Sequence, residues 1–101
     1  EKFVEANGFS VVRDLVGHGV GYGVHEDPQI PNYVIRGRNF DDIILKPGMV
    51  LAIEPMVNVG SHEIRNTPDG HTIKTVDKSL SAHFEHTVAV TEKGCEVLTK
   101  I

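Results

Sequence analysis

The chain has 101 residues, of which 40% are hydrophobic and 24% are charged, and its formal net charge at pH 7 is −4. This length allows a single domain with a small core, and the composition excludes a disordered or fibrous protein. Because the chain is acidic and its cationic residues are scattered, it lacks the basic surface that nucleic acids require, and we expect no nucleic-acid partner.

The apolar segments are too short to cross a membrane. The longest one, residues 49–59, is interrupted by Glu54 and Pro55, whereas a spanning helix needs about 20 apolar residues. The first residues lack the basic and apolar regions of a secretory signal, and the single cysteine, Cys95, cannot form an internal disulfide. We therefore expect a cytoplasmic protein with no membrane partner, in which Cys95 is a core or turn residue.

The first predicted element is the end of an amphipathic helix. Residues 3–8 have the pattern of its last turns, and Gly8 stands where a left-handed backbone closes a helix. No Ser, Thr or Asp precedes these residues as an N-cap. We therefore expect that the sequence is a piece of a longer chain, cut inside or just before this helix.

Short strands and connections are predicted after the helix. Residues 9–12 predict a strand that leads into a glycine-rich bend over residues 17–21. Residues 27–42 predict a long polar connection, because they combine prolines, asparagines and adjacent aspartates. The turn at residues 46–48 precedes a near-continuous apolar run over residues 49–53, which predicts a buried central strand.

The second half of the chain predicts further strands. Residues 63–65 and 72–76 flank a turn-like segment, which predicts a hairpin. Residues 82–91 alternate with period two and predict one strand, and a turn after it leads into a last strand over residues 96–99. One face of that alternation has Phe84, His86, Val88 and Val90, and the other has His83, Glu85, Thr87 and Ala89. The predicted fold class is α+β, with one helix followed by antiparallel strands.

Two glutamates occupy strand positions where a charge is unusual. Glu54 ends the most apolar strand and precedes Pro55, and Glu85 follows Phe84 within an otherwise apolar alternation. A buried carboxylate is destabilising unless a cation or hydrogen bonds compensate its charge. The two glutamates are therefore candidates to bind one cation, and the alternative for Glu54 is a carboxylate that points into solvent at a strand end.

Histidines supply the other candidate ligands. His18 lies between two glycines, which leave room for its imidazole to approach a shared centre. One histidine and two carboxylates form a mixed N/O donor set that suits Mn, Fe, Co or Zn. His25, at a strand-to-loop junction, is a candidate for a substrate contact; the alternative is an ordinary loop histidine. Spacing does not distinguish the other histidines, His62, His71, His83 and His86.

Five sequence blocks resemble, in this order, those of type I methionine aminopeptidases. They are Gly17-His18-Gly19-Val20-Gly21, His25-Glu26-Asp27-Pro28, Lys46-Pro47-Gly48-Met49, Ile53-Glu54-Pro55-Met56 and Ser79-Leu80-Ser81-Ala82-His83-Phe84-Glu85-His86-Thr87. The resemblance extends over residues 1–101 but covers only the second half of the family's catalytic domain. It implies half of a pita-bread fold, with an antiparallel curved sheet, as the C-terminal part of a catalytic domain whose N-terminal half is absent.

The resemblance also implies a role for each candidate residue. His18 corresponds to the histidine ligand, Glu54 to the terminal glutamate ligand and Glu85 to the bridging glutamate of a centre with two divalent ions. Glu54 is also implied as the general base, and His25 as the contact to the scissile amide of the substrate. The two aspartate ligands belong to the absent half. The implied activity is removal of N-terminal methionine from nascent proteins, with Co, Mn, Fe or Zn as the metal.

The sequence departs from the family pattern near the expected methionine pocket. His71 stands where the family commonly has tryptophan, Val24 stands where it has an aromatic residue, and His83 replaces a frequent glutamine. The first two departures imply a looser pocket.

Two other functions are compatible with the same residues. One is a proline-specific aminopeptidase of the same fold, and the other is a pita-bread unit that acts as a non-catalytic binding module. Because two ligands are missing, we expect these 101 residues alone to be inactive or nearly so. We also expect them to pair with the missing half or with a second copy, which would cover the exposed strand edge.

Overall fold

The computed structural model describes residues 1–37 and 42–101, so residues 38–41 of the connection predicted over residues 27–42 lie outside this description. The helix α1 spans Lys2–Ala6. The strands are β1 (Ser10–Val11), β2 (Gly17–Gly19), β3 (Glu26–Ile30), β4 (Val50–Ile53), β5 (Met56–Asn58), β6 (Ile64–Asn66), β7 (Ile73–Thr75), β8 (Ser81–His83), β9 (His86–Thr91) and β10 (Gly94–Val97). This content of one short helix and many strands confirms the predicted α+β class.

The strands form three antiparallel sheets in the described part of the chain. The largest has the order β10-β9-β4-β2-β3, the second has the order β1-β5-β8, and β6 and β7 form a separate hairpin. β4 is the middle strand of the largest sheet, and it contains the buried residues Leu51 and Ala52. The predicted central strand and the predicted hairpin are therefore confirmed.

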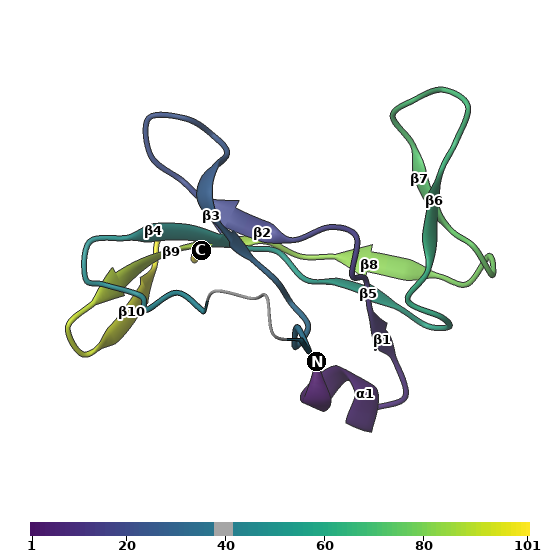
Figure 1. Cartoon of the computed structure of the whole chain (residues 1–101), viewed down its shortest axis with the longest axis horizontal. Coiled ribbons are helices and arrows are strands. Elements are labelled where there is room, and N and C mark those ends of the chain that lie inside the picture. Colours follow the sequence, from purple (N-terminus) through teal and green to yellow (C-terminus); the bar gives the residue numbers. More distant parts are fainter. Residues whose placement is uncertain (38–41) are drawn as a thin grey trace.

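The two larger sheets meet at a shared break. β4 and β5 follow one another along the long axis of the molecule, and β8 and β9 run beside them in the opposite direction (Figure 1). The strand predicted over residues 82–91 is thus wrong as a single strand, because it is interrupted at Phe84 and Glu85. The opposite interruption, at Glu54 and Pro55, includes a proline, which cannot donate a hydrogen bond to a sheet.

The predicted bend at residues 17–21 is also wrong, because its first part is the strand β2 between β3 and β4. A Cβ atom on Gly17 would lie 2.3 Å from the carbonyl oxygen of Ala52, and one on Gly19 would lie 2.1 Å from that of Asp27. The glycines therefore let neighbouring backbones approach closely, and do not mark a bend here.

The predicted polar connection begins later than expected. β3 occupies residues 26–30, so the connection can start only after Ile30. Pro28 misled the prediction, since a proline argues against a strand in the interior of a sheet. β3 is the edge strand of its sheet, where a missing N–H leaves no neighbour unpaired.

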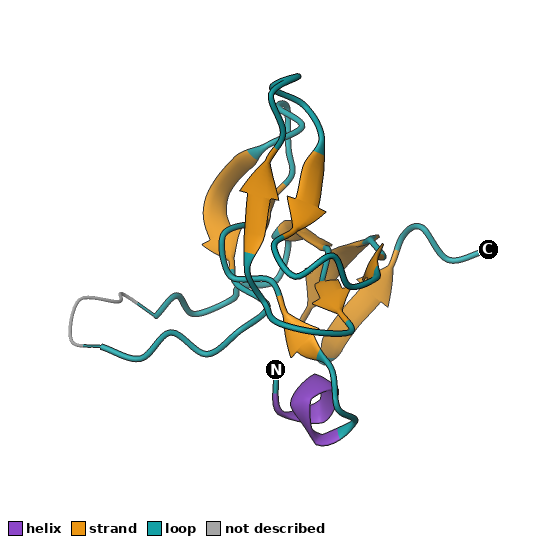
Figure 2. Cartoon of the chain, turned by 90° about the vertical axis from the view of Figure 1, so that its right-hand side faces the viewer, coloured by secondary structure: helices purple, strands orange, loops and turns teal. Residues whose placement is uncertain are grey.

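The helix and its glycine match the prediction. α1 lies at one end of the molecule, outside the strands (Figure 2). The amide N–H of Gly8 donates to the Glu5 carbonyl, and Gly8 has a φ of +82°, a conformation that side chains disfavour. No described helix is long and apolar enough to cross a bilayer.

The core is small. Its buried apolar residues are Val11, Val12, Leu51 and Ala52. Several large apolar side chains remain mostly exposed, among them Phe3, Tyr22, Ile44, Leu80 and Phe84. Cys95 was expected in the core or a turn, but it is exposed on the edge strand β10, so that expectation was wrong.

Substituting Gly17 tests the close approach of β2 to β4. We expect Gly17→Ala to lower the free energy of unfolding by about 3 kcal/mol, because its Cβ meets a backbone oxygen that cannot move aside alone. Gly8→Ala is the control, because its Cβ meets no atom within 4 Å. We expect it to lower the free energy of unfolding by about 1 kcal/mol, which is the cost of a positive φ alone. Urea unfolding followed by circular dichroism measures both, and equal losses would contradict the crowding.

The tip of the β6–β7 hairpin gives a test of pH dependence. Hydrogen bonds from the Thr67 and Thr72 side chains, and from the amides of Thr72 and His71, hold the pKa of Asp69 well below its usual range. Because this pKa is lower in the folded chain, the ionised carboxylate stabilises the tip at pH values above the ordinary aspartate pKa of about 3.9. This stabilisation is lost as the pH falls through the lower pKa of the folded state.

We expect the Thr72 amide proton to keep its NMR shift and slow exchange at pH values where free aspartate is already protonated, and to lose both only at lower pH. Asp69→Ala should exchange this amide proton as fast as an unstructured peptide does at each pH, since it lacks the acceptor. A wild-type transition centred on the ordinary aspartate pKa would contradict the assigned hydrogen bonds.

Candidate metal centre

The break between the two sheets places two carboxylates directly opposite each other. Ile53 pairs with His86 on one side of the break, and Met56 pairs with His83 on the other. Two residues separate these pairs on each strand, so the register is unchanged and Glu54 lies opposite Glu85. Like charges directly opposite on an antiparallel pair are destabilising. This position therefore favours a cation between the two side chains.

His18 reaches the same place from β2. Its backbone pairs with Ala52, two residues before Glu54, so the register puts His18, Glu54 and Glu85 on one face. The Nδ1–H of His18 donates to the carbonyl oxygen of Gly19 at 2.9 Å, because a carbonyl can only accept. In neutral His18 the lone pair is then on Nε2, which is the nitrogen a metal would bind.

A proton or a metal ion is required between the facing atoms of His18 and Glu54. The Nε2 atom of His18 lies 2.9 Å from Oε1 of Glu54. With Nδ1 as the donor, two lone pairs would face each other at this distance unless a proton or a metal ion lies between them. Two ligand atoms that each lie about 2.1 Å from one ion, with a right angle between the two bonds, would be about 3 Å apart. The observed separation of 2.9 Å fits such an ion as well as a shared proton.

The three side chains together form a donor set for a divalent ion. Among the described residues, one ligand atom each from His18, Glu54 and Glu85 lie within 4.8 Å of one another. The side chains of His18 and Glu54 are only 14% and 13% exposed, whereas Glu85 is exposed. Glu54 does not point into solvent, so that alternative is wrong. One imidazole nitrogen and two carboxylate oxygens fit Mn, Fe, Co or Zn.

His25 lies at the edge of this cluster. Its ring centroid is 4.2 Å from that of His18, with the rings tilted by 43°. His25 is the last residue of the loop between β2 and β3. A 2.7 Å hydrogen bond from the Gly23 amide to the Glu26 carboxylate fixes the shape of this loop. His25 is exposed and outside the three-residue donor set, a position compatible with a substrate contact.

A pocket of about 580 Å³ opens beside the cluster. Its lining residues are Val12, Asp14, Leu15, Val16, His18, His25, Glu54, Met56, Ile64, Ile73, Lys74, Thr75, Ser81 and His83. It thus joins the three sheets and combines apolar walls with the ends of the site side chains. Neither Val24 nor His71, the two departures from the family pattern, is part of this lining.

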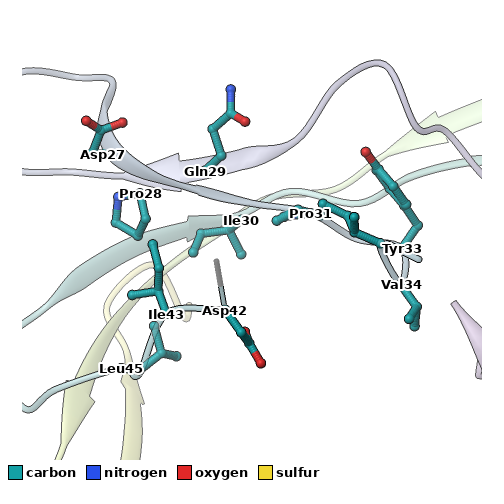
Figure 3. A pocket seen from close by; sticks show the side chains of 11 residues that line it. Asp27, Pro28, Gln29, Ile30, Pro31, Tyr33, Val34, Asp42, Ile43 and Leu45 are labelled. Atoms are coloured by element: carbon teal, nitrogen blue, oxygen red, sulfur yellow. The ribbon is translucent and has the colours of Figure 1, made fainter. Parts of the chain in front are cut away.

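A larger hollow of about 780 Å³ is lined by β3 and by the segment that follows it. Figure 3 shows Ile43 and Leu45 gathered beside Pro28 and Ile30 in its apolar part. None of the histidines and glutamates that the sequence singles out lines this hollow. Among the described residues that line it, the carboxylates are those of Asp27 and Asp42, and no histidine accompanies them, so we do not take it as the candidate site.

The structure adds His83, which sequence reasoning did not select. Nε2 of His83 lies 3.1 Å from Oε2 of Glu54, the carboxylate oxygen that does not face His18. The signal was available in the strand alternation, which put His83 on the same face as Glu85. Of the other histidines, His86 contacts Thr99 at 2.9 Å, and neither His62 nor His71 lines the pocket.

Comparison with known proteins defines the class of this site. Residues 1–92 match the model of metallopeptidase family M24, and the chain belongs to this family. Among curated proteins it is similar to methionine aminopeptidase of Escherichia coli strain K12, with 59% identity over 99 residues, or 98% of this chain and 36% of that protein. It is also 56% identical to methionine aminopeptidase of Clostridium perfringens, over all of this chain and 39% of that protein.

Solved structures show the same relationship. Methionine aminopeptidase from Thermotoga maritima matches with a TM-score of 0.90 and 54% identity, over 99% of this chain and 39% of that one. The enzyme from Rickettsia prowazekii matches with a TM-score of 0.88 and 46% identity, over 98% and 39%. The predicted half of a pita-bread fold is confirmed. The chain spans between a third and two fifths of the length of these relatives.

Proposed function

We propose that these 101 residues form the C-terminal part of a methionine aminopeptidase catalytic domain, in which His18, Glu54 and Glu85 bind divalent metal ions. The observation that supports this most directly is the cluster of three ligand atoms within 4.8 Å, in a chain of family M24. The names of the similar proteins favour methionine removal over the proline-specific alternative.

The chemistry expected of the site divides among its residues. Divalent ions held by His18, Glu54 and Glu85 would lower the pKa of a coordinated water and polarise the scissile carbonyl. Glu54 is the general base, which takes a proton from the attacking water and returns it to the departing amine. His25, exposed beside His18, contacts the scissile amide of the N-terminal methionine peptide. The ions themselves are Co, Mn, Fe or Zn, since an N/O donor set accommodates each of these.

The exposed apolar side chains support a partner for this chain. Phe3, Leu80 and Phe84 are each at least 77% exposed although the core is small. Exposed apolar surface of this kind is usual where a protein contacts another chain or domain. We propose that the partner is the other half of the catalytic domain or a second copy of this chain. The substrates are nascent proteins, and the free thiol Cys95 is compatible with a cytoplasmic location.

Metal uptake tests the proposed ligands. We expect the chain to bind Co(II) or Mn(II), and His18→Ala, Glu54→Gln and Glu85→Gln each to weaken binding at least about 10-fold, since each removes one ligand. Glu92→Gln is the matched control, because β9 separates Glu92 from Glu85 by roughly 20 Å of extended chain. Titration calorimetry measures the affinities. A wild-type chain that takes up neither ion would favour the non-catalytic binding module.

The same preparations test catalysis. We expect the metal-loaded 101 residues to release methionine from a Met-Ala peptide far more slowly than a typical enzyme, whose turnover is about 10 per second. The reason is that three ligands do not hold two ions, which together activate the water. Turnover at an ordinary enzyme rate would contradict this expectation and would mean that a second ion has found other ligands.

Sedimentation velocity tests the proposed pairing. We expect the chain alone to form dimers or to unfold over a broad temperature range. Mn(II) should sharpen the thermal unfolding transition and raise its midpoint temperature, because an ion bound only to the folded state stabilises it by mass action. A monomer with a sharp thermal transition that does not respond to metal would contradict the pairing.

A further inference from the structure

We propose that His83 is a positioning residue for Glu54, whose carboxylate it orients by donating a hydrogen bond. The proposal rests on the metal centre proposed above. The Glu54 carboxylate lies between two imidazoles: Oε1 is 2.9 Å from Nε2 of His18, and Oε2 is 3.1 Å from Nε2 of His83. One oxygen therefore faces the donor set, and the other faces a group outside it.

The contact acts through Glu54 and not through direct metal binding. An ionised carboxylate has no hydrogen to donate, so Nε2 of His83 donates to Oε2, which assigns the proton to that nitrogen. A nitrogen used in this way has no free lone pair for an ion. His83 is also absent from the group whose ligand atoms lie within 4.8 Å of one another, in the part of the chain that the structure describes.

The backbone places His83 at this position. β8 pairs with β5 so that His83 lies opposite Met56, two residues after Glu54. Next to this pair, the Phe84 amide donates to the Pro55 carbonyl at 3.3 Å across the break. The strand that presents His83 is thus fixed relative to the residues flanking Glu54. The register puts both side chains on one face, where the imidazole can reach the carboxylate diagonally.

The expected effect follows from the freedom of a glutamate side chain. The last torsion of glutamate is broad, so a carboxylate without a second partner rotates readily. With His83 in place, Oε2 is fixed and Oε1 stays directed at His18. Removing a group that orients a ligand costs about 10- to 100-fold in metal affinity. His83 itself is 48% exposed, so its replacement should leave the fold intact.

Three variants of the 101-residue chain test this role. His83→Leu removes the donor, and His83→Gln keeps an N–H donor on a side chain of similar reach. His62→Leu is the control, a histidine with no part in the pocket lining. The probe is Co(II), with affinity from titration calorimetry and ligand geometry from its visible absorption. Far-UV circular dichroism checks that each variant is folded.

We expect His83→Leu to bind Co(II) about 10- to 100-fold more weakly and with a changed visible spectrum, and His83→Gln and His62→Leu to resemble the wild type. A His83→Leu chain with wild-type affinity and spectrum would overturn the positioning role alone. So would a His83→Gln chain as weak as His83→Leu, because a donor would then not suffice. A wild-type chain that takes up no Co(II) would overturn the metal centre and this proposal with it.

Discussion

The opposition of Glu54 and Glu85 is the constraint on which the rest of the site depends. Two paired ladders, β4 with β9 and β5 with β8, flank the break and keep the same register. The register therefore keeps the Glu54 and Glu85 side chains opposite each other on one face of the sheet. Their mutual repulsion leaves a position for a cation, and His18 approaches that position from β2 with an imidazole nitrogen directed at Glu54.

The approach of His18 depends in turn on residues without bulk. Gly17 and Gly19 flank it and admit backbone oxygens where side chains would clash, and the backbone partner of His18 is Ala52, which is fully buried. A side chain on Gly17 or Gly19 would push β2 away from the neighbouring strand whose backbone oxygen it meets. The core is small and includes Leu51 and Ala52 of β4, the strand that pairs with β2 beside the site. The stability of the chain and the geometry of the site therefore depend on the same strand contacts.

Sequence reasoning predicted the elements whose patterns are local. The apolar run before Glu54 and the turn between β6 and β7 gave a central strand and a hairpin, both observed. It failed at β2 and β3, because Gly17 and Pro28 are turn formers whose roles here are set by neighbouring strands. It proposed the three ligands from their positions and donor chemistry and assigned their roles by resemblance. His83 was passed over because its contact with Glu54 depends on pairing between distant segments.

The equal length of the two interruptions has a consequence for sequence change. Each break has two residues, Glu54 and Pro55 on one strand and Phe84 and Glu85 on the other. Successive strand residues face opposite sides of a sheet, so one residue inserted between Ile53 and Glu54 would move the Glu54 side chain to the opposite surface. The pairs of β4 with β9 precede such an insertion and would be kept, while the cluster would lose a ligand. In this segment an insertion or deletion is therefore more damaging to the site than many substitutions.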